Sequence, residues 1–171
     1  TEPTLFAEMI ESLMQVAPTI NLPQFTFIDI GSGKGRALLM ASQYPFRRIL
    51  GIELLPELHR VAKENISKYK SDSQQCFAID CVLADAADFD LPIEPTVLYL
   101  FNPLPESGLI SMISRLEDSL RRNPRPVFVL YHNPLLQHVL ASQRYRRIVG
   151  TRQYSIFSRN DAAFEGIPPP P

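Results

Sequence analysis

The stretch FIDIGSGKGRALLMAS, residues 27–42, joins an apolar run, a glycine-rich turn and a helical pattern without interruption. The apolar run from Phe25 to Ile30 is typical of a buried strand, and the segment from Arg36 to Ser42 is typical of the start of a helix. Three glycines at alternate positions between them let the backbone come close to another group, where side chains would be in the way. A strand, a glycine turn and a helix N-terminus in this order predict a nucleotide-binding cradle.

Strand-like and helix-like segments alternate along the rest of the chain. Beyond the first strand, apolar runs predict strands within residues 47–53, 76–85, 96–104 and 125–134, and two more within residues 145–159. Apolar residues at helical spacing predict helices within residues 3–18, 36–42, 56–70, 109–120 and 135–142. Strands connected by helices pair in parallel, whereas the last two strands have no helix between them, so one of them runs antiparallel. The expected fold is therefore α/β, a doubly wound, mostly parallel seven-stranded sheet with helices on both faces and one antiparallel strand near an edge.

The length and composition indicate one globular domain. The chain has 171 residues, of which 45% are hydrophobic and 20% are charged, and such a chain buries a sizeable core. We expect an N-terminal helix over residues 1–20 that packs on the core, the main domain over residues 21–160, and an extended proline-rich tail over residues 161–171.

Cysteine usage and hydropathy favour a cytoplasmic protein. Cys76 and Cys81 form no metal-binding or disulfide pattern, so we interpret them as reduced thiols in the core. No apolar run approaches the roughly 20 residues of a membrane span. Residues 1–20 carry acidic side chains rather than a basic, apolar leader. We therefore expect no membrane partner.

The spacing of the glycine turn distinguishes between two cofactors. A dinucleotide fingerprint would place its third glycine at position 36, which is an arginine here. The third glycine is instead Gly35, and Asp29 stands two residues before Gly31. This arrangement resembles the first motif of class I S-adenosylmethionine-dependent methyltransferases, and the resemblance extends over nearly the whole chain. It implies the class I methyltransferase fold, a methyltransferase domain over residues 21–160, and S-adenosyl-L-methionine as the cofactor.

The resemblance also implies which residues contact that cofactor. Asp29 corresponds to the acid that helps to hold the cationic aminoacyl end, and the glycine turn lies against the adenosyl and methionyl parts. Glu53 ends the second strand, where the family has an acid that accepts hydrogen bonds from both ribose hydroxyls; taken alone, it is as readily a surface acid. In LADAADF, Asp85 and Ala86 correspond to the carboxylate and the backbone N–H that meet the adenine, with Asp88 as the competing choice. The implied cofactor-binding residues are Asp29, Gly31, Ser32, Gly33, Gly35, Glu53, Leu54, Asp85, Ala86 and Asn102.

The segment FNPLPE, residues 101–106, follows the fourth expected strand, where the family places its reacting groups. It resembles the Asn-Pro-Pro-aromatic motif of methyltransferases that act on amino nitrogens, which implies catalytic roles for Asn102 and Pro103. Leu104 stands where the second proline would be, and no aromatic residue follows it. The alternative interpretation is that Asn102 and Pro103 only turn the chain out of the strand. YHNP repeats the pattern one strand later, and its His132 is either a general base or a structural residue.

The sequence does not identify the methyl acceptor. GSGKGRALLMA and GIELLPEL also resemble class I enzymes that methylate protein lysines, so we expect an amine nitrogen, such as that of a protein lysine, or a small molecule. A segment rich in arginine and free of acidic residues is either a surface for nucleic acid or ordinary solvated surface. Its arginines are Arg121, Arg122, Arg125, Arg144, Arg146, Arg147, Arg152 and Arg159. We expect no metal, because Asp85, Asp88 and Asp90 lack the glycine and distal glutamate of a calcium loop.

Two alternatives to methyl transfer stay open. One is a nicotinamide-dependent or other nucleotide-dependent enzyme with an atypical turn, which Arg36 and Asp29 disfavour. The other is a non-catalytic binding or scaffold protein with the same fold, which the complete set of implied cofactor residues disfavours.

Overall fold

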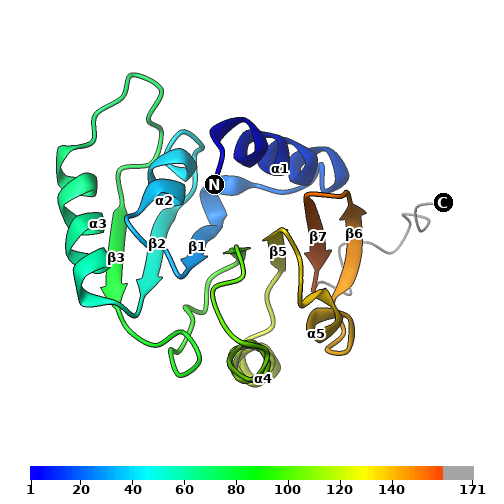
Figure 1. Cartoon of the computed structure of the whole chain (residues 1–171). Coiled ribbons are helices and arrows are strands. Elements are labelled where there is room, and N and C mark those ends of the chain that lie inside the picture. The colour runs from blue at the N-terminus through cyan, green and yellow to red at the C-terminus, as the bar shows by residue number, and fades with distance from the viewer. Residues whose placement is uncertain (160–171) are drawn as a thin grey trace.

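A single sheet of seven strands runs through the middle of the protein (Figure 1). The computed structural model describes residues 1–159, so the tail expected over residues 161–171 lies outside the described residues. The order across the sheet is β3-β2-β1-β4-β5-β7-β6. The strands are β1 (Thr26–Ile30), β2 (Arg48–Glu53), β3 (Ile79–Leu83), β4 (Thr96–Leu100), β5 (Val127–His132), β6 (Arg146–Gly150) and β7 (Tyr154–Ser158).

The strand directions confirm the doubly wound fold. β3, β2, β1, β4 and β5 pair in parallel, β7 is antiparallel to β5, and β6 is antiparallel to β7. The antiparallel strand is therefore β7, one place in from the edge strand β6. The chain winds in opposite directions from β1 and from β4, and in such sheets ligands bind at the carboxyl ends of the strands around this reversal.

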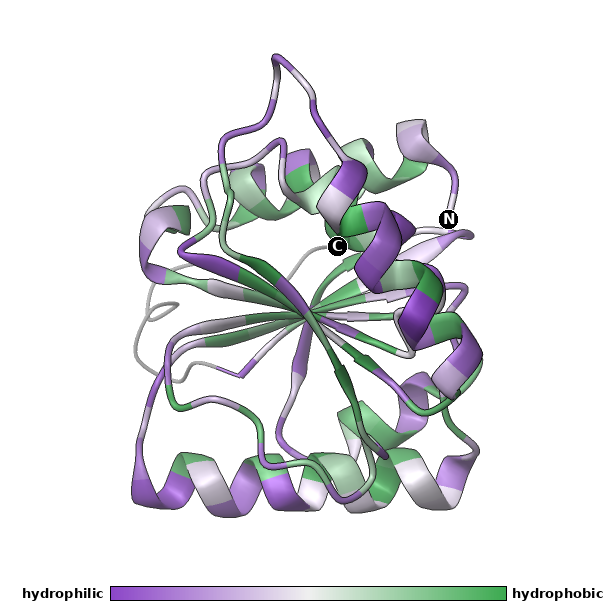
Figure 2. Cartoon of the chain, turned by 90° about the vertical axis from the view of Figure 1, so that its left-hand side faces the viewer, coloured by the Kyte–Doolittle hydropathy of each residue, from purple (hydrophilic) through white to green (hydrophobic). Residues whose placement is uncertain are grey.

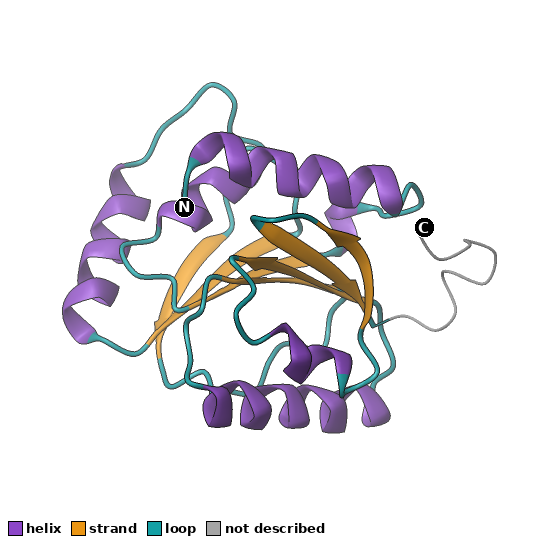
Figure 3. Ribbon diagram, turned by 45° about the vertical axis from the view of Figure 1, so that its right-hand side comes forward, coloured by secondary structure: helices purple, strands orange, loops and turns teal. Residues whose placement is uncertain are grey.

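Helices cover both faces of the sheet, as the sequence predicted (Figure 3). One face carries α1 (Pro3–Val16), α2 (Arg36–Ala41) and α3 (Pro56–Lys68), and the other carries α4 (Glu106–Arg122) and α5 (Gln137–Ala141). A short 3-10 helix, η1 (Leu22–Gln24), precedes β1. Right-handed crossovers explain the split, because connections that move in opposite directions along the sheet leave its opposite faces.

Alternate residues of the central strands fill two apolar layers. In β1, Phe27 packs with residues of α1 and α2, whereas Ile28 and Ile30 pack with residues of α4. The ring of Phe6 in α1 meets that of Phe27 edge to face, with centroids 5.8 Å apart. Figure 2 shows apolar residues along the strands and on the helix surfaces that face them. All residues of β1 are buried, which is why this strand is a continuous run and not an alternating pattern.

The connection from β3 to β4, residues 84–95, contains no helix. Its aspartates and prolines disfavour one. Phe89 and Leu91 of this loop pack into the apolar layer on the α4 side of the sheet. A loop therefore covers this part of the sheet, and β3 at the edge stays only partly buried.

Candidate functional site

The glycine turn after β1 lies at the carboxyl end of the sheet, and each of its glycines has a positive φ. These angles are 72° at Gly31, 55° at Gly33 and 82° at Gly35. A Cβ at Gly31 would lie 2.7 Å from Cβ of Pro103, and one at Gly35 would lie 3.3 Å from Cβ of Ala62. A Cβ at Gly33 would meet nothing within 4 Å. Two of the glycines are thus required by close approach within the chain, whereas the middle one faces open space.

Ser32 is buried inside the turn and not directed into that space. Its hydroxyl lies 3.3 Å from Sγ of Cys81 in β3. Its backbone N–H donates to the carbonyl of Ile52, as does that of Gly31. A Cβ at Gly51 of β2 would lie 2.6 Å from this hydroxyl, so Gly51 has to be a glycine. Gly51 and Cys81 were not among the predicted site residues, because only strand pairing brings them beneath the turn.

Glu53 joins the turn to the end of β2. Its Oε2 accepts a hydrogen bond of 2.7 Å from the Gly33 N–H, and its Oε1 accepts one of 2.8 Å from the Leu55 N–H. The side chain is 6% exposed, so it is not a surface acid. Each carboxylate oxygen has further acceptor capacity for a ligand hydroxyl. The next residue, Leu54, is 58% exposed and presents an apolar side chain beside this carboxylate.

Asp29 is a buried carboxylate that receives no hydrogen bond from any side chain or backbone group of residues 1–159. It is 4% exposed. Burial, followed by the nearby charge of Glu53, raises the pKa of Asp29 from 3.8 to about 8. Buried acids in proteins are normally paired with a donor or a cation. A cationic group that donates hydrogen bonds would therefore satisfy the Asp29 carboxylate.

The residues predicted to meet the adenine lie just beyond β3. Asp85 is exposed, and its Oδ1 accepts a hydrogen bond of 2.9 Å from the Ala87 N–H. Ala86 is buried in the apolar layer on the α4 side. The competing residue Asp88 is also exposed, and its N–H donates to the carbonyl of Asp85. The geometry leaves both acids open to a ligand and does not choose between them.

Two matching turns follow β4 and β5, and we call them the paired turns (residues 101–104 and 132–135). Asn102 and Asn133 both have a φ of 48° and both precede a proline. Nδ2 of Asn102 donates to the carbonyl of Asn133 at 2.8 Å, and its Oδ1 accepts from the Tyr131 hydroxyl at 3.0 Å. Asn102 therefore links the two turns. One hydrogen of its amide and one lone pair of its oxygen remain free to bond a ligand.

The residues before the two asparagines stack on each other. The rings of Phe101 and His132 are nearly parallel, with centroids 4.0 Å apart and an angle of 13°. Nδ1 of His132 lies 3.0 Å from the Tyr99 hydroxyl, which also lies 2.7 Å from Oγ1 of Thr1. Burial lowers the pKa of His132, so its imidazole is neutral at physiological pH. Sequence reasoning missed Tyr99, which forms part of no motif, and gave no role to Phe101, although it opens the segment FNPLPE.

Most of the arginine-rich segment lies at the opposite end of the sheet from these turns. Arg121 pairs with Asp118 at the end of α4, and Arg159 pairs with Glu117 after β7. Among the arginines of this segment, only Arg152, in the turn between β6 and β7, is at the carboxyl end of the parallel strands. The structure therefore separates the arginines from the glycine turn.

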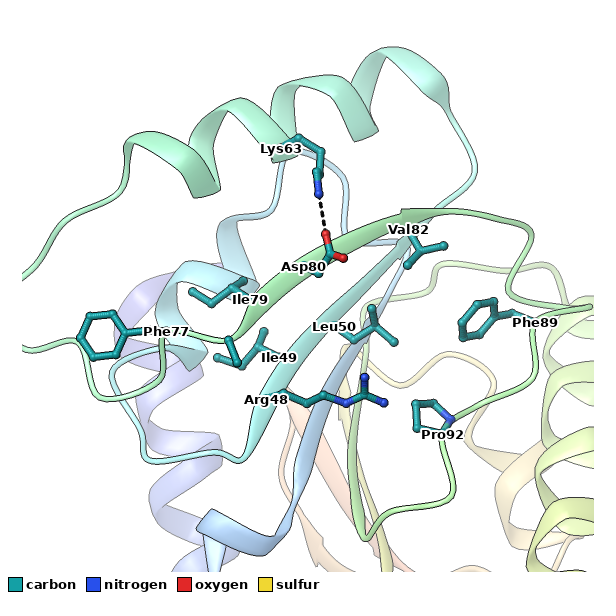
Figure 4. A pocket seen from close by; sticks show the side chains of 11 residues that line it. Arg48, Ile49, Leu50, Lys63, Phe77, Ile79, Asp80, Val82, Phe89 and Pro92 are labelled. Atoms are coloured by element: carbon teal, nitrogen blue, oxygen red, sulfur yellow. Dashed lines mark hydrogen bonds and ion pairs between the residues drawn. The ribbon is translucent and has the colours of Figure 1, made fainter.

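A separate hollow of about 610 Å³ lies along the outside of β3 (Figure 4). Phe77, Val82, Phe89 and Pro92 line it, with an ion pair between Lys63 and Asp80 at its rim. None of the predicted site residues lines this hollow. The backbone of β3 is closed to a further strand at its centre, because the Cys81 N–H donates to the Asp80 carboxylate and its carbonyl lies 2.9 Å from Nε2 of His59.

Within residues 1–159, no group of three or more histidine, cysteine or acidic side chains is placed to hold a metal ion. In the same part of the chain, no helix has the length and apolar character needed to cross a membrane.

Solved structures with a similar fold are methyltransferases, although no match is found at the level of sequence families. No protein-family model matches the sequence, and no curated protein matches it. An RNA methyltransferase from Salinibacter ruber, solved with S-adenosyl-L-homocysteine, is 20% identical with a TM-score of 0.56, and the match covers 98% of this chain and 95% of that one. A ribosomal protein L11 methylase from Lactobacillus delbrueckii subsp. bulgaricus is 17% identical with a TM-score of 0.56, covering 90% and 77%. Magnesium protoporphyrin IX methyltransferase from Synechocystis PCC 6803, solved with bound SAM, is 13% identical with a TM-score of 0.56, also covering 90% and 77%.

These similarities show that the chain has the fold of class I S-adenosylmethionine-dependent methyltransferases. The resemblance inferred from the glycine turn is therefore confirmed at the level of the fold.

Proposed function

We propose that the protein is an S-adenosylmethionine-dependent methyltransferase whose cofactor binds at the glycine turn. The observation that carries this proposal is the buried Asp29 carboxylate, which has no donor within residues 1–159 and lies in the electrostatic field of Glu53. The ammonium group at the aminoacyl end of the cofactor has the charge and the donors that this position needs. A dinucleotide would instead bring a pyrophosphate, whose negative charges the carboxylates of Glu53 and an ionised Asp29 would repel.

The other predicted residues fit the remaining parts of the cofactor. The open side of Gly33 leaves space against the backbone, and Glu53 has acceptor capacity for the ribose hydroxyls. We assign the exposed apolar side chain of Leu54 to the adenine ring, and the exposed Asp85 with the backbone of Ala86 to its amino group and ring edge. Gly31, Ser32 and Gly35 act by shaping the turn and through their backbones.

When bound, the cofactor supplies an electrophilic methyl group, which the lone pair of the acceptor attacks as the carbon–sulfur bond breaks and its electron pair stays on sulfur. Asn102 and Pro103 border the place where the acceptor would approach, since Pro103 lies directly against Gly31. We propose that they orient the acceptor, with positioning supplying much of the rate. The spare amide hydrogen and oxygen lone pair of Asn102 suit an amine or hydroxyl.

The acceptor class follows from the charges around the paired turns. Exposed or half-buried side chains there include Phe101, Pro103, Leu104 and Leu135, with no arginine or lysine in either turn. A protein lysine or a small molecule therefore fits better than nucleic acid, whose phosphates would need the distant arginines. The named structural relatives act on RNA, a ribosomal protein and a porphyrin, so they do not favour one class.

We further propose a methyltransferase domain over residues 21–160, with the helix within residues 1–20 as a cover, in a cytoplasmic protein. The buried apolar stripe of α1 supports the first point, and the two free buried thiols, Cys76 and Cys81, support the second.

Calorimetry with S-adenosyl-L-homocysteine and with NAD tests the proposed function. We expect the first to bind and the second not to, and we expect Asp29→Asn to weaken the binding at least about tenfold. Asp72→Asn, which changes an exposed acid in the loop between α3 and β3, is the matched control. Binding of NAD without any response to S-adenosyl-L-homocysteine would refute the proposal, and binding without turnover on any acceptor would favour a scaffold.

A further inference from the structure

In the paired turns an imidazole stacks on the residue that precedes the two proposed acceptor-positioning residues, and the following inference rests on the function proposed above. His132 stacks on Phe101, the residue that immediately precedes Asn102 and Pro103, and Pro103 lies against Gly31. The imidazole therefore packs on the same turn that contacts the glycine turn through Pro103. It lies at the carboxyl end of β5, beside the reversal in strand order, where ligands bind in this class of fold.

The hydrogen bond at Nδ1 bears on which nitrogen of His132 is basic. The Tyr99 hydroxyl has one hydrogen and two close partners, Oγ1 of Thr1 at 2.7 Å and Nδ1 of His132 at 3.0 Å. The shorter distance is usual for O–H···O and the longer one for N–H···O. In that arrangement Tyr99 donates to Thr1 and accepts from Nδ1–H. The lone pair of the neutral imidazole then lies on Nε2, which has no hydrogen-bond partner within residues 1–159.

We propose that His132 is the general base of the methyl transfer and takes the proton of the acceptor at Nε2, with Tyr99 as the positioning residue that holds Nδ1–H. The O–H or N–H bond of the acceptor breaks and its electron pair forms the bond to the methyl carbon, while the carbon–sulfur bond breaks and its electron pair stays on sulfur. The proton makes His132 an imidazolium. That proton is then released to solvent. The stacked ring of Phe101 fixes the plane of the imidazole during the transfer.

The groups around His132 suit a base that is neutral in the resting protein. Burial is the main cause of its lowered pKa. Asp29, on β1, acts electrostatically on Tyr99 and not directly on the imidazole. Tyr154 pairs with His132 across the sheet, but its hydroxyl is bonded to α1. The titratable groups that face the ring from the neighbouring elements are Tyr99, Tyr154 and, through Tyr99, Asp29.

Nitrogen NMR of the protein labelled at histidine tests the tautomer without needing an acceptor. The chain has three histidines, so His59 and His138 give internal reference signals, and His132→Gln assigns the third. We expect His132 to be neutral at physiological pH, protonated at Nδ1 and unprotonated at Nε2, both free and with S-adenosyl-L-homocysteine bound. Tyr99→Phe removes the acceptor for Nδ1–H, so the tautomer ratio should shift toward Nε2–H. A wild-type His132 protonated at Nε2 would overturn the proposal.

A transfer assay with labelled cofactor tests the catalytic role, with tyramine and poly-L-lysine as the acceptor probes. If His132 is the base, His132→Gln should lower the rate by about 10²-fold or more and remove the acid limb of the pH profile. Its affinity for S-adenosyl-L-homocysteine should be unchanged. His138→Gln, an exposed histidine paired with Glu106 outside the paired turns, is the control and should retain the rate.

The outcomes separate this inference from the proposed function. An unchanged rate and pH profile in His132→Gln refutes the base while leaving the methyltransferase intact. Failure of the wild type to bind S-adenosyl-L-homocysteine refutes the methyltransferase itself. If neither probe is methylated, the tautomer of His132 measured by NMR still decides whether Nε2 is available as a base.

Discussion

The glycine turn after β1 and the paired turns after β4 and β5 solve the same backbone problem in different ways. All of them leave a strand at the carboxyl end of the sheet with positive φ angles. The first uses glycines and leaves polar capacity open, at the unpaired Asp29 and beside Gly33. The paired turns use asparagines, and the Asn102 side chain is bonded to the neighbouring turn. The difference indicates that a ligand completes the first region, whereas the chain itself largely completes the second.

The largest expected effect concerns the buried carboxyl group of Asp29. In the unfolded chain this acid ionises near its ordinary value of 3.8, and in the folded protein its pKa is raised to about 8. Between these values the folded state keeps a proton that the unfolded state has lost, so stability falls as pH rises from about 4 to about 8, by about 1.4 kcal/mol per pH unit and on the order of 6 kcal/mol in total. Urea unfolding across this pH range measures the decline. Asp29→Asn should flatten it and Asp88→Asn should not; an equally steep decline in Asp29→Asn would contradict the assignment.

The glycines of the first turn should differ from one another by a smaller amount. Gly31→Ala combines a left-handed backbone with a 2.7 Å approach to Pro103, so we expect it to lower the free energy of unfolding by about 3 kcal/mol. Gly33→Ala has the backbone strain alone, and about 1 kcal/mol is expected. Chemical denaturation compares the two. Equal losses would mean that Pro103 moves away freely and that the turns after β1 and β4 are not tightly packed.

Glu53 connects stability to binding in the first region. Glu53→Ala removes the carboxylate that accepts from the Gly33 and Leu55 N–H groups, so unfolding should become easier by about 2 kcal/mol. The affinity for S-adenosyl-L-homocysteine should fall at least about tenfold, because the ribose hydroxyls lose their acceptor. Calorimetry on the folded variant measures the second effect. Glu53→Gln, which keeps one carbonyl oxygen, should have an intermediate affinity. An unchanged affinity in both variants would contradict the assignment of Glu53, at the end of β2, to the ribose hydroxyls.

The paired turns allow a matched test of Asn102. Asn102→Ala leaves the Tyr131 hydroxyl and the Asn133 carbonyl without this partner, in addition to backbone strain, so we expect a loss of about 1–2 kcal/mol in unfolding free energy. Asn133→Ala has the same φ and shows only the backbone part. If Asn102 also orients the acceptor, turnover per folded molecule falls by about 10²-fold with cofactor affinity intact. Wild-type turnover with a lowered melting temperature would assign Asn102 to the scaffold alone.

The smallest effect is expected at Leu54. The side chain is 58% exposed, so Leu54→Ala should change the free energy of unfolding by less than about 0.5 kcal/mol. If it packs against the adenine, the affinity for S-adenosyl-L-homocysteine should fall roughly threefold. Calorimetry and chemical denaturation measure the two quantities. An unchanged affinity would remove Leu54 from the proposed site while leaving the glycine turn unaffected.

The sequence by itself determined the parts of the fold that depend on local pattern. Alternating apolar runs and helical periodicities predict the strand and helix order, and the missing helix before the last strand predicts the antiparallel partner. The glycine turn, with Asp29 before it, was recognisable because its φ angles and close approaches restrict the residue types within a few positions of one another.

Only the tertiary structure decided how the strand ends meet. Gly31 touches Pro103, Asn102 bonds Asn133, and His132 stacks on Phe101 across gaps of about thirty residues or more, for which no local pattern gives a signal. The arginines are collected in the sequence but mostly lie at the far end of the sheet, because crossover connections return the chain there before each parallel strand. Local sequence specifies elements through backbone and side-chain preferences within a few residues, whereas the chemistry of a site depends on neighbours that strand pairing brings together.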